Sequence, residues 1–506
     1  MTDILIGKGE SQVFLKTEML NRHGLIAGAT GTGKTTTLKV IAERASMLGI
    51  PVFIPDVKGD LYGLHIAGEE NEKINERLNF IGDNSFKFQS FPVQSWDILE
   101  NLGVPIRATV SDLGPILLSN LLELNDVQTG ILNIAFKVAD ERGLLILDFK
   151  DLKSVLNYIS ENSNELRAEY GNISPQSVGA INRALLVLEN EGAEKFFGEP
   201  ALDVNDLIKK TPDGKGIINI LNSKVLFQRP KLYTTFLLWF LSEIYEILPE
   251  VGDLEIPKML FFFDEAHLIF SQGSKVLKDK LLQVIKLIRS KGVGVFFVTQ
   301  SPGDIPEDVL SQLGNKIQHA LRAFTPKDRK MIKDTAMNFR ENPNLDIESA
   351  LTNMKSGEAL VSCLDEKGLP QVTEKALIMP PMSSFGTMSE EYIKDFSNSS
   401  ILMSKYKDVI DRESAYEVLL AEKKRIDAEK EQLEQEKERI KAEELSRKEQ
   451  ERLKKEEERL ERERKKNRSE LEKFGGRVIN SMIGTASRKI GNELVRGIFG
   501  TLLGKK

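Results

Sequence analysis

The segment GLIAGATGTGKTT, residues 24–36, decides the fold of this 506-residue chain. A short apolar run is followed by the pattern G-x-x-x-x-G-K-[ST] and then by a helical pattern, which is the strand–loop–helix order of a phosphate-binding loop. Its glycines let backbone N–H groups wrap around phosphates, and the helix that follows directs its positive end at them. The residues predicted to contact a nucleotide are Gly28, Ala29, Thr30, Gly31, Thr32, Gly33, Lys34, Thr35 and Thr36.

Two residues of this loop and two further along the chain have separate predicted tasks. The Lys34 ammonium would reach the β- and γ-phosphates of ATP, and the Thr35 hydroxyl would ligate Mg²⁺. The segment MLFFFDE (259–265) is an apolar strand that ends in two carboxylates. We expect Asp264 to share the Mg²⁺ shell and Glu265 to be the general base that accepts a proton from the attacking water. ATP and Mg²⁺ are therefore the predicted ligands.

Four other side chains are candidates because of their places beside strands. Gln300 ends the strand GVFFVTQ, where a polar group can bond the γ-phosphate or orient water. Arg289 and Arg322 each stand next to a predicted strand, and either is a candidate to serve a neighbouring subunit; a plain helix-end cation is the alternative for Arg289. Asp56 ends the strand after the phosphate-binding helix, either as a ligand-coupling residue or as a turn cap. His23 is expected to be structural, and for His267 a helix-start residue is favoured over a group that tunes the two carboxylates.

Apolar strands alternate with helical patterns from residue 23 onward, which predicts an α/β fold with a parallel sheet. The helix over 234–248 is apolar nearly all round and is expected inside the core. Residues 1–22 are expected to form a hairpin, and about 70–210 a helical insert in a domain that spans 23–385. The predicted strands are 24–28, 52–56, 216–221, 259–265, 294–300, 316–323 and 358–364.

The composition restricts the class of protein. With 41% hydrophobic residues the chain can bury a large core, and its single cysteine, Cys363, excludes a disulfide framework and fits a reducing cytoplasm. Because the sequence contains no stretch of about 18 uninterrupted apolar residues and no signal-peptide layout, a soluble cytoplasmic protein is expected. The net charge is -6, with the acidic excess before residue 421. That charge argues against DNA binding over an open surface and leaves a local contact, for instance in the pore of a ring.

The C-terminal part of the sequence changes character three times. Residues 386–412 are polar and turn-rich and are expected to be a linker. Residues 413–472 read as a charged helix with acidic and basic residues about four apart; several of its sparse apolar residues are seven apart, which leaves a coiled coil and a lone solvated helix both open. Residues 473–506 carry an apolar stripe with a basic rim. For this amphipathic tail an oligomer contact is favoured over a membrane anchor.

Taken in order, six segments of the chain resemble the HerA/FtsK superfamily of RecA-like motor ATPases: RHGLIAGATGTGKTTT, VFIPDVKGDL, FFFDEAHLIF, IRSKGVGVFFVTQSP, HALRAFTPKD and SGEALVSCL. More narrowly, about residues 1–385 look like the bacterial HerA-like group called YjgR, which has a helicase HerA-like C-terminal domain, and the closing RGIFGTLLG resembles that group's tail. The resemblance implies a RecA-like core, a trans-acting arginine finger at Arg289 and a γ-phosphate sensor at Gln300. It also implies a hexameric ring that pumps DNA. HerA proper has a β-barrel before its P-loop, whereas here only 27 residues precede Gly28.

Three functions follow as alternatives. The first is a ring-forming ATPase that moves or remodels a polymer, with double-stranded DNA as the favoured polymer. The second is an ATP-dependent assembly switch or scaffold, which would engage copies or a partner protein through the charged helix. The third is a membrane-peripheral ATPase, which rests on the basic amphipathic tail.

Overall fold

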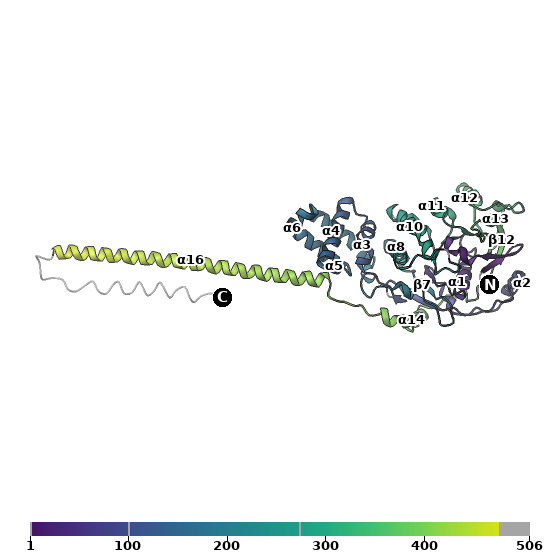
Figure 1. Cartoon of the computed structure of the whole chain (residues 1–506), viewed down its shortest axis with the longest axis horizontal. Coiled ribbons are helices and arrows are strands. Elements are labelled where there is room, and N and C mark those ends of the chain that lie inside the picture. The colour runs from purple at the N-terminus through teal and green to yellow at the C-terminus, as the bar shows by residue number, and fades with distance from the viewer. Residues whose placement is uncertain (1–2, 100–101, 253, 273–274, 475–506) are drawn as a thin grey trace. The chain divides into compact units, whose positions relative to one another are not determined.

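The computed structural model describes residues 3–99, 102–252, 254–272 and 275–474. The chain divides into two compact units, Met1–Ala421 and Glu422–Lys506. The first unit holds a twelve-stranded sheet with helices on both faces (Figure 1). Of the second unit the structure describes the charged helix up to Phe474, so the predicted amphipathic tail lies outside the described residues.

The sheet has the strand order β2-β1-β12-β11-β10-β3-β9-β8-β4-β7-β5-β6. Its strands are β1 (Ile4–Lys8), β2 (Gln12–Leu15), β3 (Gly24–Ala27), β4 (Val52–Asp56), β5 (Val93–Asp97), β6 (Val104–Pro105), β7 (Ile218–Asn222), β8 (Met259–Phe263), β9 (Val293–Thr299), β10 (Asn315–His319), β11 (Glu358–Ser362) and β12 (Glu374–Ile378). From β10 to β6 all neighbouring strands are parallel, whereas β11, β12, β1 and β2 are added in antiparallel pairs. The predicted α/β fold is confirmed, with an antiparallel extension at one edge.

The α-helices of the first unit lie in the connections between the strands, except for the last two, which follow β12. They are α1 (Lys34–Met47), α2 (Glu72–Ile81), α3 (Val110–Leu121), α4 (Asp126–Arg142), α5 (Phe149–Glu161), α6 (Ser163–Tyr170), α7 (Pro175–Asn190), α8 (Pro230–Ile247), α9 (His267–Gln272), α10 (Lys275–Ile288), α11 (Glu307–Leu310), α12 (Pro326–Met337), α13 (Ile347–Asn353), α14 (Glu390–Asn398) and α15 (Ile401–Tyr406). The last helix, α16 (Ala415–Phe474), begins in the first unit and continues into the second.

The central strands are apolar throughout because both faces of the sheet are covered. Every residue of β8 and β9 is buried. Successive side chains of a strand point to opposite faces, so the two phenylalanines Phe261 and Phe263 join one core cluster and Phe262 joins another. Continuous apolar runs of this kind are typical of parallel sheets between two layers of helices.

Helix α8 is inside the core, as its nearly uniform apolar sequence predicted. Its Phe240 ring lies 4.4 Å from that of Phe53 on β4, and Phe53 in turn stacks on Phe261 of β8 at 5.3 Å. Both Phe236 and Phe240 are fully buried. The helix therefore covers the middle of the sheet on the face away from α1.

The segment 70–210, expected to be a helical insert, holds helices α2 to α7 and also two strands. Figure 1 shows α3, α4, α5 and α6 gathered at one side of the sheet. Strands β5 and β6 instead join the sheet beside β7. Three of the five residues of β5, VQSWD, are polar, which concealed this strand from a search for apolar runs.

Residues 386–412 were expected to be a linker, and the structure instead packs them onto the first unit. They hold α14 and α15, and the Tyr406 side chain is fully buried. Its hydroxyl donates a 2.6 Å hydrogen bond to Asp206, and its carbonyl accepts a 2.7 Å bond from Arg107. One buried aromatic ring with satisfied polar groups is enough to fix a polar, turn-rich segment.

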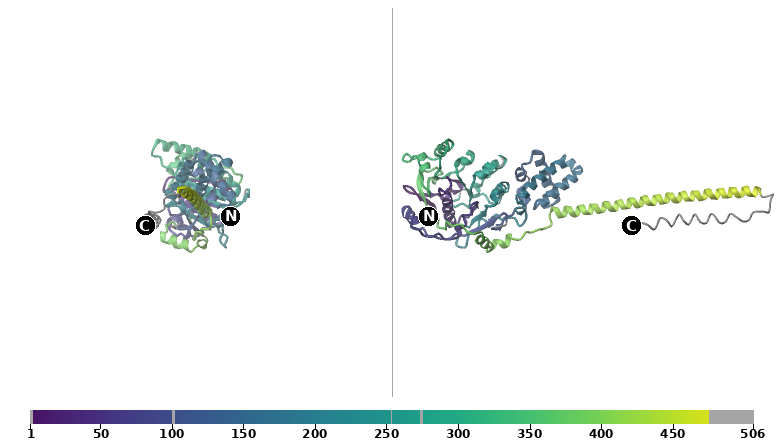
Figure 2. Two further views of the ribbon diagram at one scale, coloured as in Figure 1. Left: turned by 90° about the vertical axis from the view of Figure 1, so that its left-hand side faces the viewer. Right: turned by 180° about the vertical axis from the view of Figure 1, so that it is seen from behind.

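Helix α16 is one uninterrupted helix in the right-hand view of Figure 2. Its first turns belong to the first unit, where Ala415 and Leu419 are buried. From residue 423 onward its described side chains are solvent-exposed. In the described part of the chain no helix has both the length and the apolar character needed to cross a membrane.

Candidate active site

The candidate residues from three strands converge at the carboxyl edge of the parallel sheet. The phosphate-binding loop follows β3, Asp264 and Glu265 follow β8, and Gln300 follows β9. Strand β9 pairs with β3 on one side and β8 on the other. Gln300 therefore lies between the phosphate-binding loop and the two carboxylates, and its side chain is exposed.

The loop backbone has the glycine-dependent shape that phosphate binding needs. Gly28 has φ +153, and a Cβ there would lie 2.5 Å from the Cβ of His319. Gly33 has φ +118 and leads directly into α1, which starts at Lys34. The first N–H groups of a helix lack partners inside it, and here they lie beside the exposed residues Thr30 and Gly31. This helix start can receive an anion.

The Lys34 ammonium is turned back onto its own loop. Its Nζ donates to the carbonyls of Gly28 at 2.7 Å and Ala29 at 3.2 Å, and the residue is buried. Burial lowers the pKa of Lys34, and the nearby charge of Lys58 lowers it further. Phosphate oxygens are stronger partners for an ammonium than carbonyls. A nucleotide in this loop would therefore satisfy Lys34 better than its present bonds.

The two carboxylates after β8 are in different surroundings. Burial raises the pKa of Asp264 to about 7, opposed by Lys58 and assisted by Glu265. Glu265 is buried and has φ +48, a left-handed conformation that a residue with a Cβ rarely adopts. The N–H of Ala266 donates to the Val298 carbonyl at 3.0 Å and fixes this turn against β9. Strained backbone of this kind costs about 1 kcal/mol or more and concentrates at functional sites.

Thr35 and Asp264 fit the predicted Mg²⁺ ligands. A dication beside Asp264 would favour the ionised carboxylate that burial disfavours. In nucleotide sites Mg²⁺ takes one or two protein oxygens and completes its shell with phosphates and water. Such a site needs no cluster of three acidic or histidine ligands, and the described residues contain none.

The turn after β4 brings Lys58 to the carboxylates. Lys58 Nζ lies 3.1 Å from Glu265 Oε1, and His267 Nδ1 lies 3.4 Å from Oε2 of the same residue. The Asp56 carboxylate accepts the N–H groups of Lys58, Gly59 and Leu61 at 3.2, 2.7 and 3.0 Å. Of its two predicted roles, Asp56 has that of the turn cap. Lys58 was missed as a site residue, although a cation at the carboxyl end of a parallel strand was a usable signal.

His319 packs against the phosphate-binding loop at Gly28. It lies on β10 and is fully buried. Its Nδ1 is 2.9 Å from the Glu358 carbonyl, which can only accept, so Nδ1 carries the proton and Nε2 accepts from the Thr37 hydroxyl at 2.8 Å. Burial lowers the pKa of His319 to about 4, which keeps the ring neutral. No spacing in the sequence connects residues 37 and 319.

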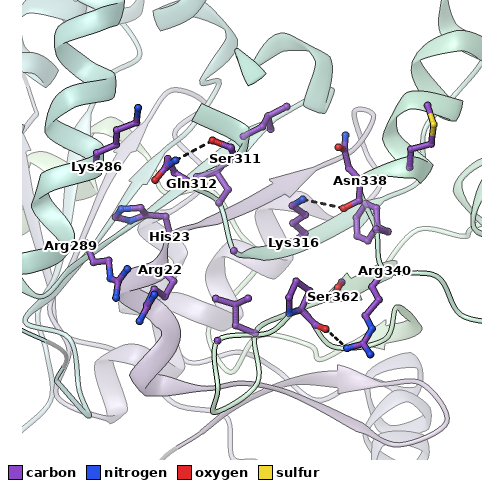
Figure 3. Close-up of a pocket in the computed structure, with 18 residues that line it drawn as sticks. Arg22, His23, Lys286, Arg289, Ser311, Gln312, Lys316, Asn338, Arg340 and Ser362 are labelled. Carbon is purple, nitrogen blue, oxygen red and sulfur yellow. Dashed lines mark hydrogen bonds between the residues drawn. The ribbon is translucent and has the colours of Figure 1, made fainter. Parts of the chain in front are cut away.

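Arg289 lies at the opposite, amino edge of the sheet, before β9. It lines a cavity of about 610 Å³ together with other cations, which are Arg22, Lys286, Lys316 and Arg340. Figure 3 shows Arg22 and Arg289 at the same end of this cavity, and Arg340 at the other. None of the described residues that line it is acidic. The cavity is a basic surface remote from the chain's own phosphate-binding loop.

Arg322 follows β10 on the carboxyl edge and is exposed, with a 3.2 Å hydrogen bond to the Thr352 carbonyl. The adjacent Phe324 is 89% exposed. Helix α12 begins two residues later and carries four basic side chains, Lys327, Arg329, Lys330 and Lys333. The structure thus separates the two arginine candidates: Arg322 is beside an exposed aromatic residue and Arg289 is in the basic cavity.

The sequence of the chain is similar to those of several known proteins. A family described as helicase HerA-like C-terminal matches residues 2–506. The chain is 27% identical over 375 residues to the DNA double-strand break repair helicase HerA of Sulfurisphaera tokodaii, covering 71% of this chain and 66% of the relative. It is 24% identical over 359 residues to the DNA import protein CedB of Sulfolobus acidocaldarius, covering 69% and 51%. It therefore spans just under two thirds of the HerA relative's length.

Among solved structures, the chain is similar to the plasmid coupling protein TrwB in complex with the non-hydrolysable GTP analogue GDPNP. The identity is 15%, the match covers 74% of this chain and 89% of that chain, and the TM-score is 0.49.

Proposed function

The chain belongs to the helicase HerA-like C-terminal family, and we propose that it is a Mg²⁺-dependent ATPase that moves or remodels double-stranded DNA. The observation that carries the proposal is the convergence of three predicted elements at one sheet edge. Gln300, at the end of β9, stands between the loop after β3 and the carboxylates after β8.

In the proposed reaction each side chain has a task that matches its place. The loop N–H groups and Lys34 bind the phosphates, and Thr35 with Asp264 would hold Mg²⁺, which neutralises phosphate charge. Glu265 accepts a proton from the water that attacks the γ-phosphorus, and Gln300 orients that water. The products are ADP and phosphate.

The proposal includes a ring, and a hexamer is its favoured form. Arg289 lies at the edge of the sheet opposite the chain's own nucleotide loop, so it would act on the phosphates of a neighbouring copy. Charge accumulates on the γ-phosphoryl oxygens in the transition state, and a guanidinium supplied there is worth roughly 10³-fold or more in rate. A cytoplasmic location is also part of the proposal, supported by the single, buried Cys363.

Double-stranded DNA is the proposed polymer because the first unit has a helix with several basic side chains, α12, next to an exposed aromatic residue. Phe324 is 89% exposed beside α12, whose Lys327, Arg329 and Lys330 are close in sequence. Clustered cations neutralise phosphates, and an exposed phenylalanine can wedge between base steps of a duplex. HerA, named as a DNA double-strand break repair helicase, supports the same substrate class.

The test is ATP turnover with and without double-stranded DNA, with Lys34→Ala as the inactive reference. We expect turnover by the native chain, stimulation by DNA, and neither with Lys34→Ala. Absence of Lys34-dependent turnover would remove the ATPase. Turnover that ignores DNA would leave the assembly switch as the better function, and native mass measured with and without ATP would then test that function.

A further inference from the structure

Lys58 is the second lysine at the candidate active site, and its contact is with the predicted base rather than with the phosphate-binding loop. Its Nζ lies 3.1 Å from Glu265 Oε1. The Glu265 side chain is 9% exposed, whereas that of Lys58 is 43% exposed. The lysine is therefore the partner with room to move, while its backbone stays fixed by the Asp56 carboxylate.

This ion pair opposes the chemistry proposed for Glu265. A general base needs a free oxygen within hydrogen-bond reach of the water it deprotonates. An ammonium group on Oε1 occupies one of the two oxygens that could accept the proton. His267 Nδ1 lies 3.4 Å from the other oxygen. Oε1 can accept a proton from water only when Lys58 leaves it.

The terminal phosphate of ATP is the group able to draw Lys58 away. A base that acts through one water lies one water from the γ-phosphorus, so a cation in contact with that base is within side-chain reach of the γ-phosphate. The Lys34 ammonium lies at the phosphate-binding loop, where it bonds the Gly28 carbonyl. A γ-phosphate held by Lys34 and contacted by Lys58 would relieve the repulsion between the two ammonium groups. ADP has no phosphate at this point.

We propose that Lys58 detects the γ-phosphate. It pairs with Glu265 while ADP or no nucleotide is bound. When ATP binds, Lys58 pairs with the terminal phosphate instead, which frees Glu265. The inference rests on the proposed ATPase function and adds discrimination between triphosphate and diphosphate to it. Because Lys58 exchanges Glu265 for the γ-phosphate, binding of ATP is coupled to release of Glu265.

The test measures the affinity of the full chain for Mg²⁺-ADP and for Mg²⁺-AMPPNP by calorimetry. Lys58→Met should weaken AMPPNP binding roughly tenfold or more, because a charge-assisted hydrogen bond is lost, and leave ADP binding unchanged. Glu265→Gln should strengthen AMPPNP binding, because Lys58 then has no ion pair to break before it contacts the phosphate. The double variant Lys58→Met/Glu265→Gln should show no such gain.

The matched control is Lys224→Met, which removes a lysine in a 3.2 Å surface pair with Glu390. It should change neither affinity. Lys58→Arg, which keeps the charge, should retain part of the AMPPNP preference. Equal loss of both nucleotides in Lys58→Met, or no loss of either, would overturn the role of Lys58. If the native chain binds neither nucleotide, the proposed ATPase itself fails.

Discussion

Arg289 and Gln300 stand at opposite ends of the same strand. Arg289 precedes β9 and Gln300 follows it, with the seven residues Val293–Thr299 between them. At about 3.3 Å per residue the strand separates them by roughly 20 Å. An arginine side chain cannot span that distance to the chain's own phosphate-binding loop. Any action of Arg289 on a nucleotide must therefore occur in another copy of the chain.

The first prediction follows from this separation. Arg289→Ala should bind ATP normally and hydrolyse it poorly, and so should Glu265→Gln. Mixing the two variants should restore part of the activity, because an intact Glu265 site can then meet an intact Arg289. ATP turnover of verified mixed oligomers is the measurement, and Arg447→Ala on α16 is the control that should stay active. If mixed oligomers recover nothing, Arg322 becomes the better candidate.

The second prediction separates binding from hydrolysis. Lys34→Ala should lose nucleotide binding, because it removes the cation at the β- and γ-phosphates. Glu265→Gln should keep the shape of the site and bind ATP, while turnover falls at least about 10²-fold with the loss of the base. Equilibrium binding and turnover measured on the same samples test both. Near-native turnover by Glu265→Gln would show that the base is another group.

The third prediction concerns pH and stability. Burial lowers the pKa of His319 to about 4 from an ordinary value of 6.5, and His23 has the same shift. At these two histidines the unfolded chain therefore binds more protons than the folded chain between these values. Burial raises the pKa of Asp264 to about 7 and that of Asp56 to about 6, and these carboxyl groups act in the opposite direction. The contribution of each histidine to stability should be complete above pH 6.5 and fall by about 1 kcal/mol for each pH unit from there toward pH 4.

Urea unfolding at pH 7.5 and 5.5 measures this loss, and His319→Gln provides the comparison. The variant cannot titrate at position 319, so its unfolding free energy at pH 5.5, relative to its own value at pH 7.5, should be about 1 kcal/mol higher than that of the native chain. The same change in both proteins would contradict the assignment to His319. A difference of this size that arises above pH 6.5 would contradict it as well.

The sequence predicted the sheet and the nucleotide loop because both are local patterns. Apolar runs such as β8 and β9 identify strands that are buried on both faces, and the loop motif carries its own backbone demands. Other features depend on residues far apart in the chain. Lys58 meets Glu265, and His319 meets Thr37, only after the parallel strands align. Tyr406 likewise becomes a core residue only when the fold brings it to Asp206, which accepts a hydrogen bond from its hydroxyl.

The fourth prediction concerns the Phe324 surface. Lys330→Ala should weaken binding of double-stranded DNA uniformly across sequences. It should also reduce the slope of log affinity against log salt concentration by about one, as expected for the loss of a phosphate contact. Phe324→Ala should weaken binding without changing the salt dependence. Binding isotherms at three salt concentrations give both quantities. Lys137→Ala, at an exposed site on α4, is the control. Unchanged affinity in both test variants would exclude this surface as the DNA contact.

The last prediction decides between a coiled coil and a lone helix for α16. Its apolar residues Leu419, Ile426, Leu433 and Ile440 are seven apart, so they form one stripe, but a coiled coil needs two apolar positions per heptad. If the stripe is position a, the other core position d holds Glu422, Glu429 and Glu436; if the stripe is position d, position a holds Lys423, Lys430 and Lys437. Either register places like charges against each other in a parallel in-register pair.

The helix has support of its own from pairs such as Arg439–Glu443 and Arg459–Glu463, four residues apart at 3.8 Å. Each such pair adds about 0.2–0.5 kcal/mol and weakens with salt. Leu433→Ala/Ile440→Ala should therefore leave native mass unchanged, because the second core position is charged in either register. Salt should reduce the helix signal of the full chain relative to a chain that ends at residue 421. A lower native mass in the double variant would instead establish the coiled coil, because only a stripe buried between helices makes assembly depend on those two side chains.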